Sequence, residues 1–113
     1  MRAPRLAEPA DGSDAGIERA SYDNHVVYTG ESTFEETGTI SLGEGDDELQ
    51  IATLVDGTLG PSAHADVLHG AVVYRITGGG GRFDGASGLI TSNFLLWPAT
   101  GEFEERQVAI VFI

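Results

Sequence analysis

Short runs in which apolar and polar residues alternate make up the chain from Asn24 onwards, and clusters of glycine and aspartate separate them. Residues 32–42 show this best, because Phe34, Ile40 and Leu42 fall on one face and mainly polar residues fall on the other. A period of two is typical of a half-buried β-strand, and the sequence lacks segments with the longer period of an amphipathic helix. The sequence therefore predicts an all-β fold.

The number and spacing of these runs predict the architecture. Further runs occur at residues 25–28, 49–59, 71–77, 89–97 and 107–113. A closed antiparallel barrel removes the exposed edges that such strands would otherwise leave. We therefore expect a single small antiparallel β-barrel of about eight strands over residues 24–113, with a β-sandwich as the alternative. Residues 1–23 are rich in proline and glycine, lack periodicity and are expected to form an irregular N-terminal arm.

Composition argues against several classes of function. The chain has 18 acidic residues against 6 Lys and Arg, a formal net charge of −12, which disfavours binding to nucleic acid and to anionic membranes. It has no cysteine, so disulfides, thiolate metal sites and cysteine nucleophiles are excluded. The sequence shows neither a signal peptide nor an apolar run long enough to span a membrane, so we expect a cytoplasmic protein.

Four consecutive glycines at residues 78–81 mark the most unusual segment of the chain. A phosphate-binding loop would need a Gly-Lys-Ser/Thr sequence or a spaced glycine motif ahead of a helix, and neither is present. Glycines also suit a sharp reversal with β-bulges at a barrel corner. We expect such a reversal here, with Phe83 entering the core and with Ala86 and Gly88 keeping the returning strand thin.

This segment resembles a known corner motif. It reads Ile76-Thr77-Gly78-Gly79-x-Gly81-x-Phe83-x-Gly85-Ala86-x-Gly88, which is similar to the corner of the allene oxide cyclase barrel proteins and of the related dirigent proteins. Those families usually carry Ser or Thr where this chain has Gly80. Residues 59–62, 69–70 and 89–94 also resemble the small bacterial members, so the similarity covers roughly residues 59–98. It implies a calycin-like barrel with a cavity, in a homodimer or homotrimer, and it transfers no catalytic residue to this chain.

Glu36 is the first candidate for chemistry. It is in register with Phe34 and Ile40, on the face expected to point inward. A carboxyl group inside an apolar barrel has a raised pKa and can act as a general acid or base. The alternative is that position 36 lies near the mouth of the barrel and is solvated. Tyr74 is the second candidate for guiding protons.

Other side chains on the expected inner faces are candidates for ligand binding. Thr53, Tyr74 and Ser92 would orient a ligand or, alternatively, bond to one another or to a buried water. Phe83, Phe94, Leu96 and Phe112 are expected to form the cavity wall. Phe112 enters this set because we expect Val108, Ile110 and Phe112 to face the interior. Ala109, Val111 and Ile113 would then lie outside, covered by the N-terminal arm or by a second subunit.

Metal and cofactor sites are not expected. His25, His64 and His69 lack the spacing of a helical zinc-binding pair. The acidic turn at residues 43–48 lacks the spacing of an EF-hand loop.

Three functional hypotheses follow. The preferred one is a non-catalytic barrel that binds a small apolar or amphipathic molecule or serves as an interaction module. The second is a cofactor-free isomerase or cyclase resembling allene oxide cyclase, in which Glu36 or Tyr74 guides protons. The third is a structural barrel with a filled interior. An open cavity with a buried Glu36 favours the second, an open cavity with Glu36 outside favours the first, and a filled interior favours the third.

Overall fold

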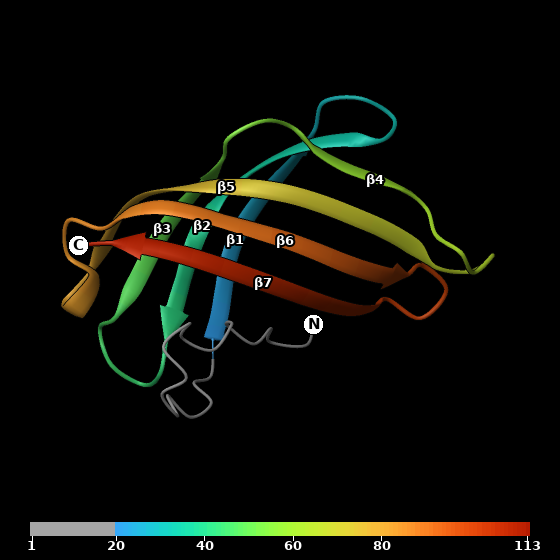
Figure 1. The fold of residues 1–113 in the computed structure, drawn as a ribbon. Coiled ribbons are helices and arrows are strands. Elements are labelled where there is room, and N and C mark those ends of the chain that lie inside the picture. The colour runs from blue at the N-terminus through green and yellow to red at the C-terminus, as the bar shows by residue number, and fades with distance from the viewer. Residues whose placement is uncertain (1–19) are drawn as a thin grey trace.

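The computed structural model describes residues 20–113, which form seven β-strands and one short helical turn (Figure 1). The strands are β1 (Ala20–Tyr28), β2 (Thr33–Leu42), β3 (Glu48–Thr53), β4 (Gly57–Pro61), β5 (Leu68–Gly80), β6 (Ser87–Trp97) and β7 (Glu102–Phe112), with a 3₁₀ turn, η1 (Gly81–Phe83), between β5 and β6. All pairings are antiparallel. The predicted all-β fold is confirmed.

Hydrogen bonds close a small barrel through β2, β3, β5 and β4. The strands β3 and β4 occupy successive stretches of the same position, between β2 on one side and β5 on the other. The run predicted at residues 49–59 is therefore interrupted at residues 54–56, where the chain leaves the sheet. The remaining strands extend this barrel, β1 from β2, and β6 and β7 from β5.

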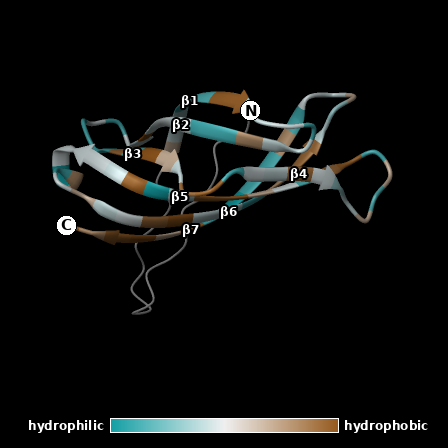
Figure 2. Cartoon of the chain, turned by 90° about the horizontal axis from the view of Figure 1, so that it is seen from above, coloured by the Kyte–Doolittle hydropathy of each residue, from teal (hydrophilic) through white to brown (hydrophobic). Residues whose placement is uncertain are grey.

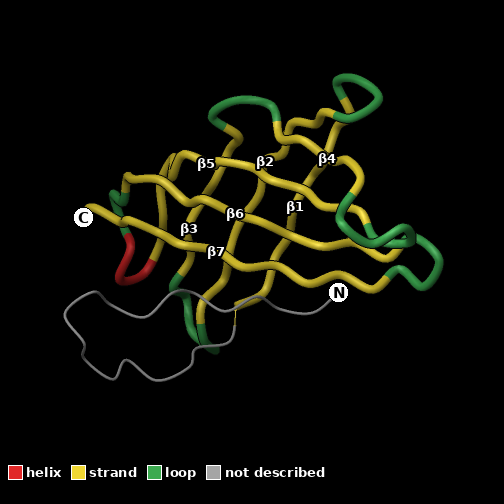
Figure 3. Tube along the Cα trace, turned by 45° about the vertical axis from the view of Figure 1, so that its right-hand side comes forward, coloured by secondary structure: helices red, strands yellow, loops and turns green. Residues whose placement is uncertain are grey.

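The extended sheet curls so that two layers cross at an angle, as Figures 1 and 3 show: β5, β6 and β7 form one layer, and β1, β2 and β3 form the other. Within the described part of the chain, β1 and β7 are the two free edges. One end of the space between the layers is filled by aliphatic side chains, among them Ile40, Leu49 and Ile90. Burying each of these contributes about 1.5–3 kcal/mol. The other end is hollow.

The glycine-rich segment makes the predicted reversal between β5 and β6. The pairing of β3 with β5 shifts register between Gln50 and Ile51, which is the expected irregularity at this corner. Gly88 has a φ of +135°, and a Cβ there would lie 2.0 Å from the carbonyl oxygen of Ile110. Phe83 packs, half-buried, against the core, and Ala86 is buried. The predicted reversal and the close approach at Gly88 are therefore confirmed, whereas Phe83 packs against the core without entering it.

The N-terminal boundary differs from the prediction. The strand β1 begins at Ala20, so residues 20–23 belong to the sheet, whereas the rest of the predicted arm lies outside the described residues. Ala20 is buried opposite Leu42, and Tyr22 and Asn24 follow it on the inner face. The sequence predicts the start of this strand only weakly, because small and polar residues occupy the inward positions where an apolar pattern would be expected.

The predicted orientation of the last strand is wrong. Val108, Ile110 and Phe112 are 56%, 59% and 64% exposed, whereas Gln107 is 3% exposed. Gln107 pairs with Ser92 on the inner face of β6, and this register turns the next residue outward. Both faces of residues 107–113 are apolar, so hydropathy does not determine which face is buried. Figure 2 shows the hydrophobic C-terminal part of β7.

Candidate functional site

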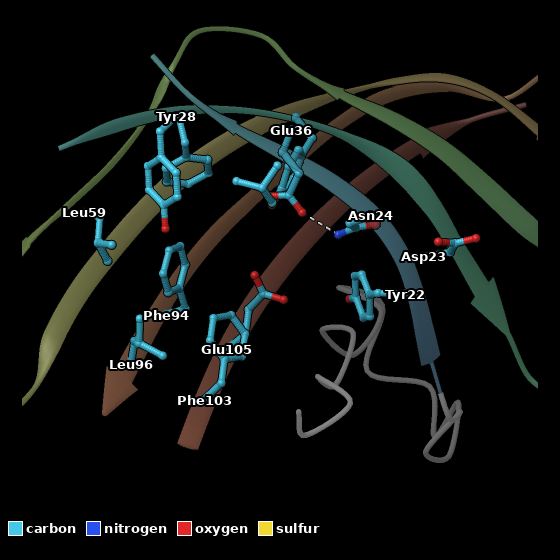
Figure 4. Close-up of a pocket in the computed structure, with 13 residues that line it drawn as sticks. Tyr22, Asp23, Asn24, Tyr28, Glu36, Leu59, Phe94, Leu96, Phe103 and Glu105 are labelled. Carbon is cyan, nitrogen blue, oxygen red and sulfur yellow. Dashed lines mark hydrogen bonds between the residues drawn. The ribbon is translucent and has the colours of Figure 1, made fainter. Parts of the chain in front are cut away.

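A partly open cavity of about 420 Å³ occupies the hollow end of the fold (Figure 4). Its lining comes from both layers and from β4. Figure 4 shows that its polar and apolar groups are segregated: Leu59, Phe94 and Leu96 lie towards one end, while Tyr22 and Asn24 lie towards the other. The cavity is therefore amphipathic.

Aromatic rings form the apolar end. The ring centroids of Phe34 and Phe94 are 6.1 Å apart across the two layers, and those of Phe94 and Phe103 are 5.1 Å apart. Two glycines make room for these rings. A Cβ at Gly57 would lie 2.3 Å from Cζ of Phe34, and a Cβ at Gly70 would lie 1.9 Å from Cζ of Phe94. The wall thus depends on the absence of side chains at both positions.

Glu36 lies in the cavity wall at the polar end and is 8% exposed. The Tyr74 hydroxyl donates to its Oε1 over 2.7 Å, and the Asn24 amide donates to its Oε2. Burial raises the pKa of Glu36, and these two hydrogen bonds offset part of that rise. The predicted inward orientation is confirmed, and the alternative of a solvated position is wrong.

Glu105 is a second carboxyl group in the same cavity. Its Oε2 accepts from the Ser92 hydroxyl at 2.6 Å, and its Oε1 accepts from the Gln107 amide at 3.2 Å. Burial raises the pKa of Glu105, the Ser92 hydrogen bond lowers it, and the charge of Glu36 raises it further. The Tyr22 hydroxyl donates to Oε1 of Gln107 over 2.7 Å and so joins the free edges β1 and β7.

The two tyrosines act as neutral donors. Burial raises the pKa of both phenols, and the nearby carboxylates raise it further: Glu36 at Tyr74, and Glu105 and then Glu36 at Tyr22. Both hydroxyls therefore stay protonated at neutral pH. No Lys, Arg or His is among the described residues that line the cavity. Neutral groups thus make every hydrogen bond found at the two carboxyl groups.

Some of the residues that were predicted to form the site line the cavity, and others lie next to it. Tyr74 and Phe94 line the cavity together with Glu36, and so does Leu96. Ser92 and Thr53 are adjacent to it, because Ser92 bonds to Glu105 and the Thr53 hydroxyl accepts from the backbone N–H of Glu36 at 3.3 Å.

Two predicted wall residues lie elsewhere. Phe83 sits at the glycine-rich corner, where it packs against the filled core and not against the cavity. Phe112 is on the outer face of β7, because the orientation of that strand is opposite to the predicted one. Neither ring therefore contributes to the cavity wall.

Sequence reasoning missed Glu105, Phe103, Asn24 and Tyr22. Glu105 and Phe103 share the inner face of β7, so the correct orientation of that strand would have identified both. Asn24 and Tyr22 belong to the first strand, which begins earlier than predicted. The alternation of Ala20, Tyr22 and Asn24 is the only signal that the sequence offers for them.

A second hollow, of about 400 Å³, is lined by His64 and His69 together with Leu95 and Trp97. Nε2 of His69 lies 3.2 Å from Oδ1 of Asn93. Among residues 20–113, no group of three or more His, Asp or Glu side chains is arranged to hold a metal ion. That same stretch contains no helix long and apolar enough to cross a membrane.

Comparison with known protein families, curated proteins and solved structures finds no match to this chain. The resemblance of residues 59–98 to the allene oxide cyclase barrel proteins therefore stays a prediction.

Proposed function

We propose that the protein binds a small amphipathic molecule in this cavity and that Glu36 transfers a proton on the bound molecule, in a cofactor-free isomerisation. The observation that carries the proposal is the position of Glu36, buried in the wall of an open cavity. This combination favours an enzyme over a passive barrel. The volume of about 420 Å³ falls within the range of small-molecule sites.

The surroundings of Glu36 suit a group that gives and takes a proton. A raised pKa brings a carboxyl group closer to neutral pH, where proton transfer in both directions is most efficient. Tyr74 and Asn24 each hold one carboxylate oxygen, which orients the group. A carboxylate oxygen has a second lone pair, so each still has an acceptor site for a substrate proton.

The proton transfer balances without a further reactant. The Glu36 carboxylate takes a proton from a carbon next to a carbonyl group of the substrate, and the electron pair moves into the enolate. Glu36 then returns the proton to a different atom, so that the product is an isomer of the substrate. The aromatic end of the cavity holds the hydrocarbon part and limits the access of water.

Binding without chemistry is the second candidate. It is supported by the neutral donors, which already give each carboxylate oxygen of Glu36 and Glu105 one hydrogen bond. A polar end whose carboxylate oxygens already accept hydrogen bonds can orient a ligand without catalysing a reaction. The cavity itself argues against the third hypothesis, a barrel with a filled interior.

Native mass spectrometry of the protein as purified from its host tests the binding step. We expect a retained small molecule of defined mass, and the same spectrum gives the oligomeric state. The retained molecule is then incubated with the protein and with the Glu36→Gln variant. We expect the variant to keep the molecule bound and to lose conversion by about 10²–10⁴-fold.

Glu35→Gln is the matched control, because Glu35 is the neighbouring residue on β2 and is exposed. It should convert the molecule at the wild-type rate. Equal conversion by wild type and Glu36→Gln would refute the catalytic role. A molecule that binds and is never converted would favour the second candidate.

A further inference from the structure

We infer that the molecule bound in this cavity carries a positively charged nitrogen next to an apolar or aromatic body, and that Glu105 pairs with that nitrogen. The inference rests on the proposed function, since it names the chemical class of the molecule in the same cavity. It assigns a separate role to each carboxyl group: Glu36 moves the proton, and Glu105 holds the cation.

Among residues 20–113, no positively charged side chain lines the cavity to balance its carboxyl groups. Glu36 and Glu105 both line it, and the charge of Glu36 raises the pKa of Glu105. Their hydrogen-bond donors are a phenol, a hydroxyl and two amides, which supply dipoles but no positive charge. The arginines within residues 20–113 (Arg75, Arg82 and Arg106) are all exposed. A cationic ligand would supply the missing charge in a setting of low dielectric, where ion pairing is strong.

Hydrogen-bonding capacity points to a ligand that donates. Each oxygen of Glu105 accepts one hydrogen bond and, as a carboxylate oxygen, has a second lone pair. An ammonium group has up to three N–H donors and no acceptor, which matches this excess of acceptors.

The apolar end fits the rest of such a molecule. Phe103 precedes Glu105 by two residues on the inner face of β7, and its ring stacks on Phe94 at 5.1 Å. The charged and aromatic parts of the site therefore adjoin. Aromatic faces attract cations and also pack against flat apolar groups. The overall charge of −12 adds a long-range attraction for cationic ligands and repels anionic ones.

Three probes with the same body and different head groups test the inference: phenylbutylamine, which is cationic at neutral pH, phenylbutanol, which is neutral, and phenylbutyrate, which is anionic. Their dissociation constants are measured by titration calorimetry at low ionic strength. We expect the amine to bind the wild-type protein at least about tenfold more tightly than the alcohol, and the acid to bind most weakly. In Glu105→Gln the amine should bind about as weakly as the alcohol, and binding of the alcohol should be unchanged.

Glu102→Gln is the matched control, because Glu102 lies on the same strand and is exposed. It should keep the preference for the amine. If wild type binds the alcohol as tightly as the amine, or if the preference survives in Glu105→Gln, the inference is refuted while binding in the cavity stands. If none of the three probes binds, the proposed function fails as well. The wild-type comparison requires no variant, so the test holds even if Glu105→Gln does not fold.

Discussion

Gly70 controls the shape of the cavity, and Gly70→Ala tests this directly. The added Cβ would lie 1.9 Å from Cζ of Phe94, whereas carbon atoms in contact are about 3.5–4.0 Å apart. The ring must therefore move by about 1.5–2 Å. It sits at the end of a flexible side chain beside an open cavity, so it can move inward without shifting the backbone. We expect Phe94 to enter the cavity and to occupy the space of the ligand.

The expected effects on stability and on binding differ. Overpacking costs about 1–3 kcal/mol, and replacing glycine by alanine within a strand returns about 0.5–1 kcal/mol, so the net loss of stability is small. Binding of phenylbutanol, which fills the apolar end, should weaken by about tenfold or more. Urea unfolding gives the first quantity and titration calorimetry the second.

Gly60→Ala is the control, since a Cβ at position 60 of β4 would meet no atom within 4 Å. It should leave binding of phenylbutanol unchanged. A crystal structure of Gly70→Ala with Phe94 in its original place would refute the reasoning. So would wild-type affinity for phenylbutanol in that variant.

Three further predictions follow from the site and the outer face. Burial raises the pKa of Glu36 and Glu105 above their values in the unfolded chain. The free energy of unfolding is therefore highest below the unfolded pKa and falls as the pH rises through the folded pKa. Urea unfolding should give a lower free energy at about pH 8 than at about pH 5, and the difference should be smaller in the Glu36→Gln/Glu105→Gln double variant. Tyr74→Phe removes the donor to Oε1 of Glu36 and should cost about 1–3 kcal/mol in urea unfolding, and an unchanged free energy would contradict the importance of that bond. Ile110→Asp places a charge on the exposed apolar face of β7. If this face joins subunits, light scattering should give a smaller mass for the variant than for wild type. An unchanged mass would exclude this face as the interface.

The part of the site that the sequence predicts lies on strands with a single apolar face. In residues 32–42, apolar side chains recur at alternate positions and mainly polar ones fill the rest, and in residues 71–77 the larger side chains of Val72, Tyr74 and Ile76 share one face while Arg75 and Thr77 lie on the other. One register therefore buries the apolar set better than the other. Glu36 and Tyr74 are placed correctly for this reason. The same logic fails for residues 107–113, where both faces are apolar, and Glu105 is missed as a result.

The sequence does not predict the role of Gly57 and Gly70 in the cavity wall, and the reason differs from that for Glu105. A glycine in a strand signals a close approach of something, but its partner is set by tertiary structure. Phe34 and Phe94 reach these glycines from neighbouring strands, 23 and 24 residues away in the chain. Hydropathy patterns within one segment contain no information on such pairs.

The hydrogen bond between Tyr22 and Gln107 has a consequence for the order in which the protein folds. The two residues are 85 positions apart, whereas β1 and β2, β5 and β6, and β6 and β7 pair as neighbours along the chain. Closing a long loop costs more conformational entropy than closing a hairpin, so contacts between near neighbours form first. The two edges then meet late, and the polar end of the cavity is completed only at that step. Ligand binding would accordingly lag behind the formation of the β-sheet in a refolding experiment, and it would report on the last event of folding.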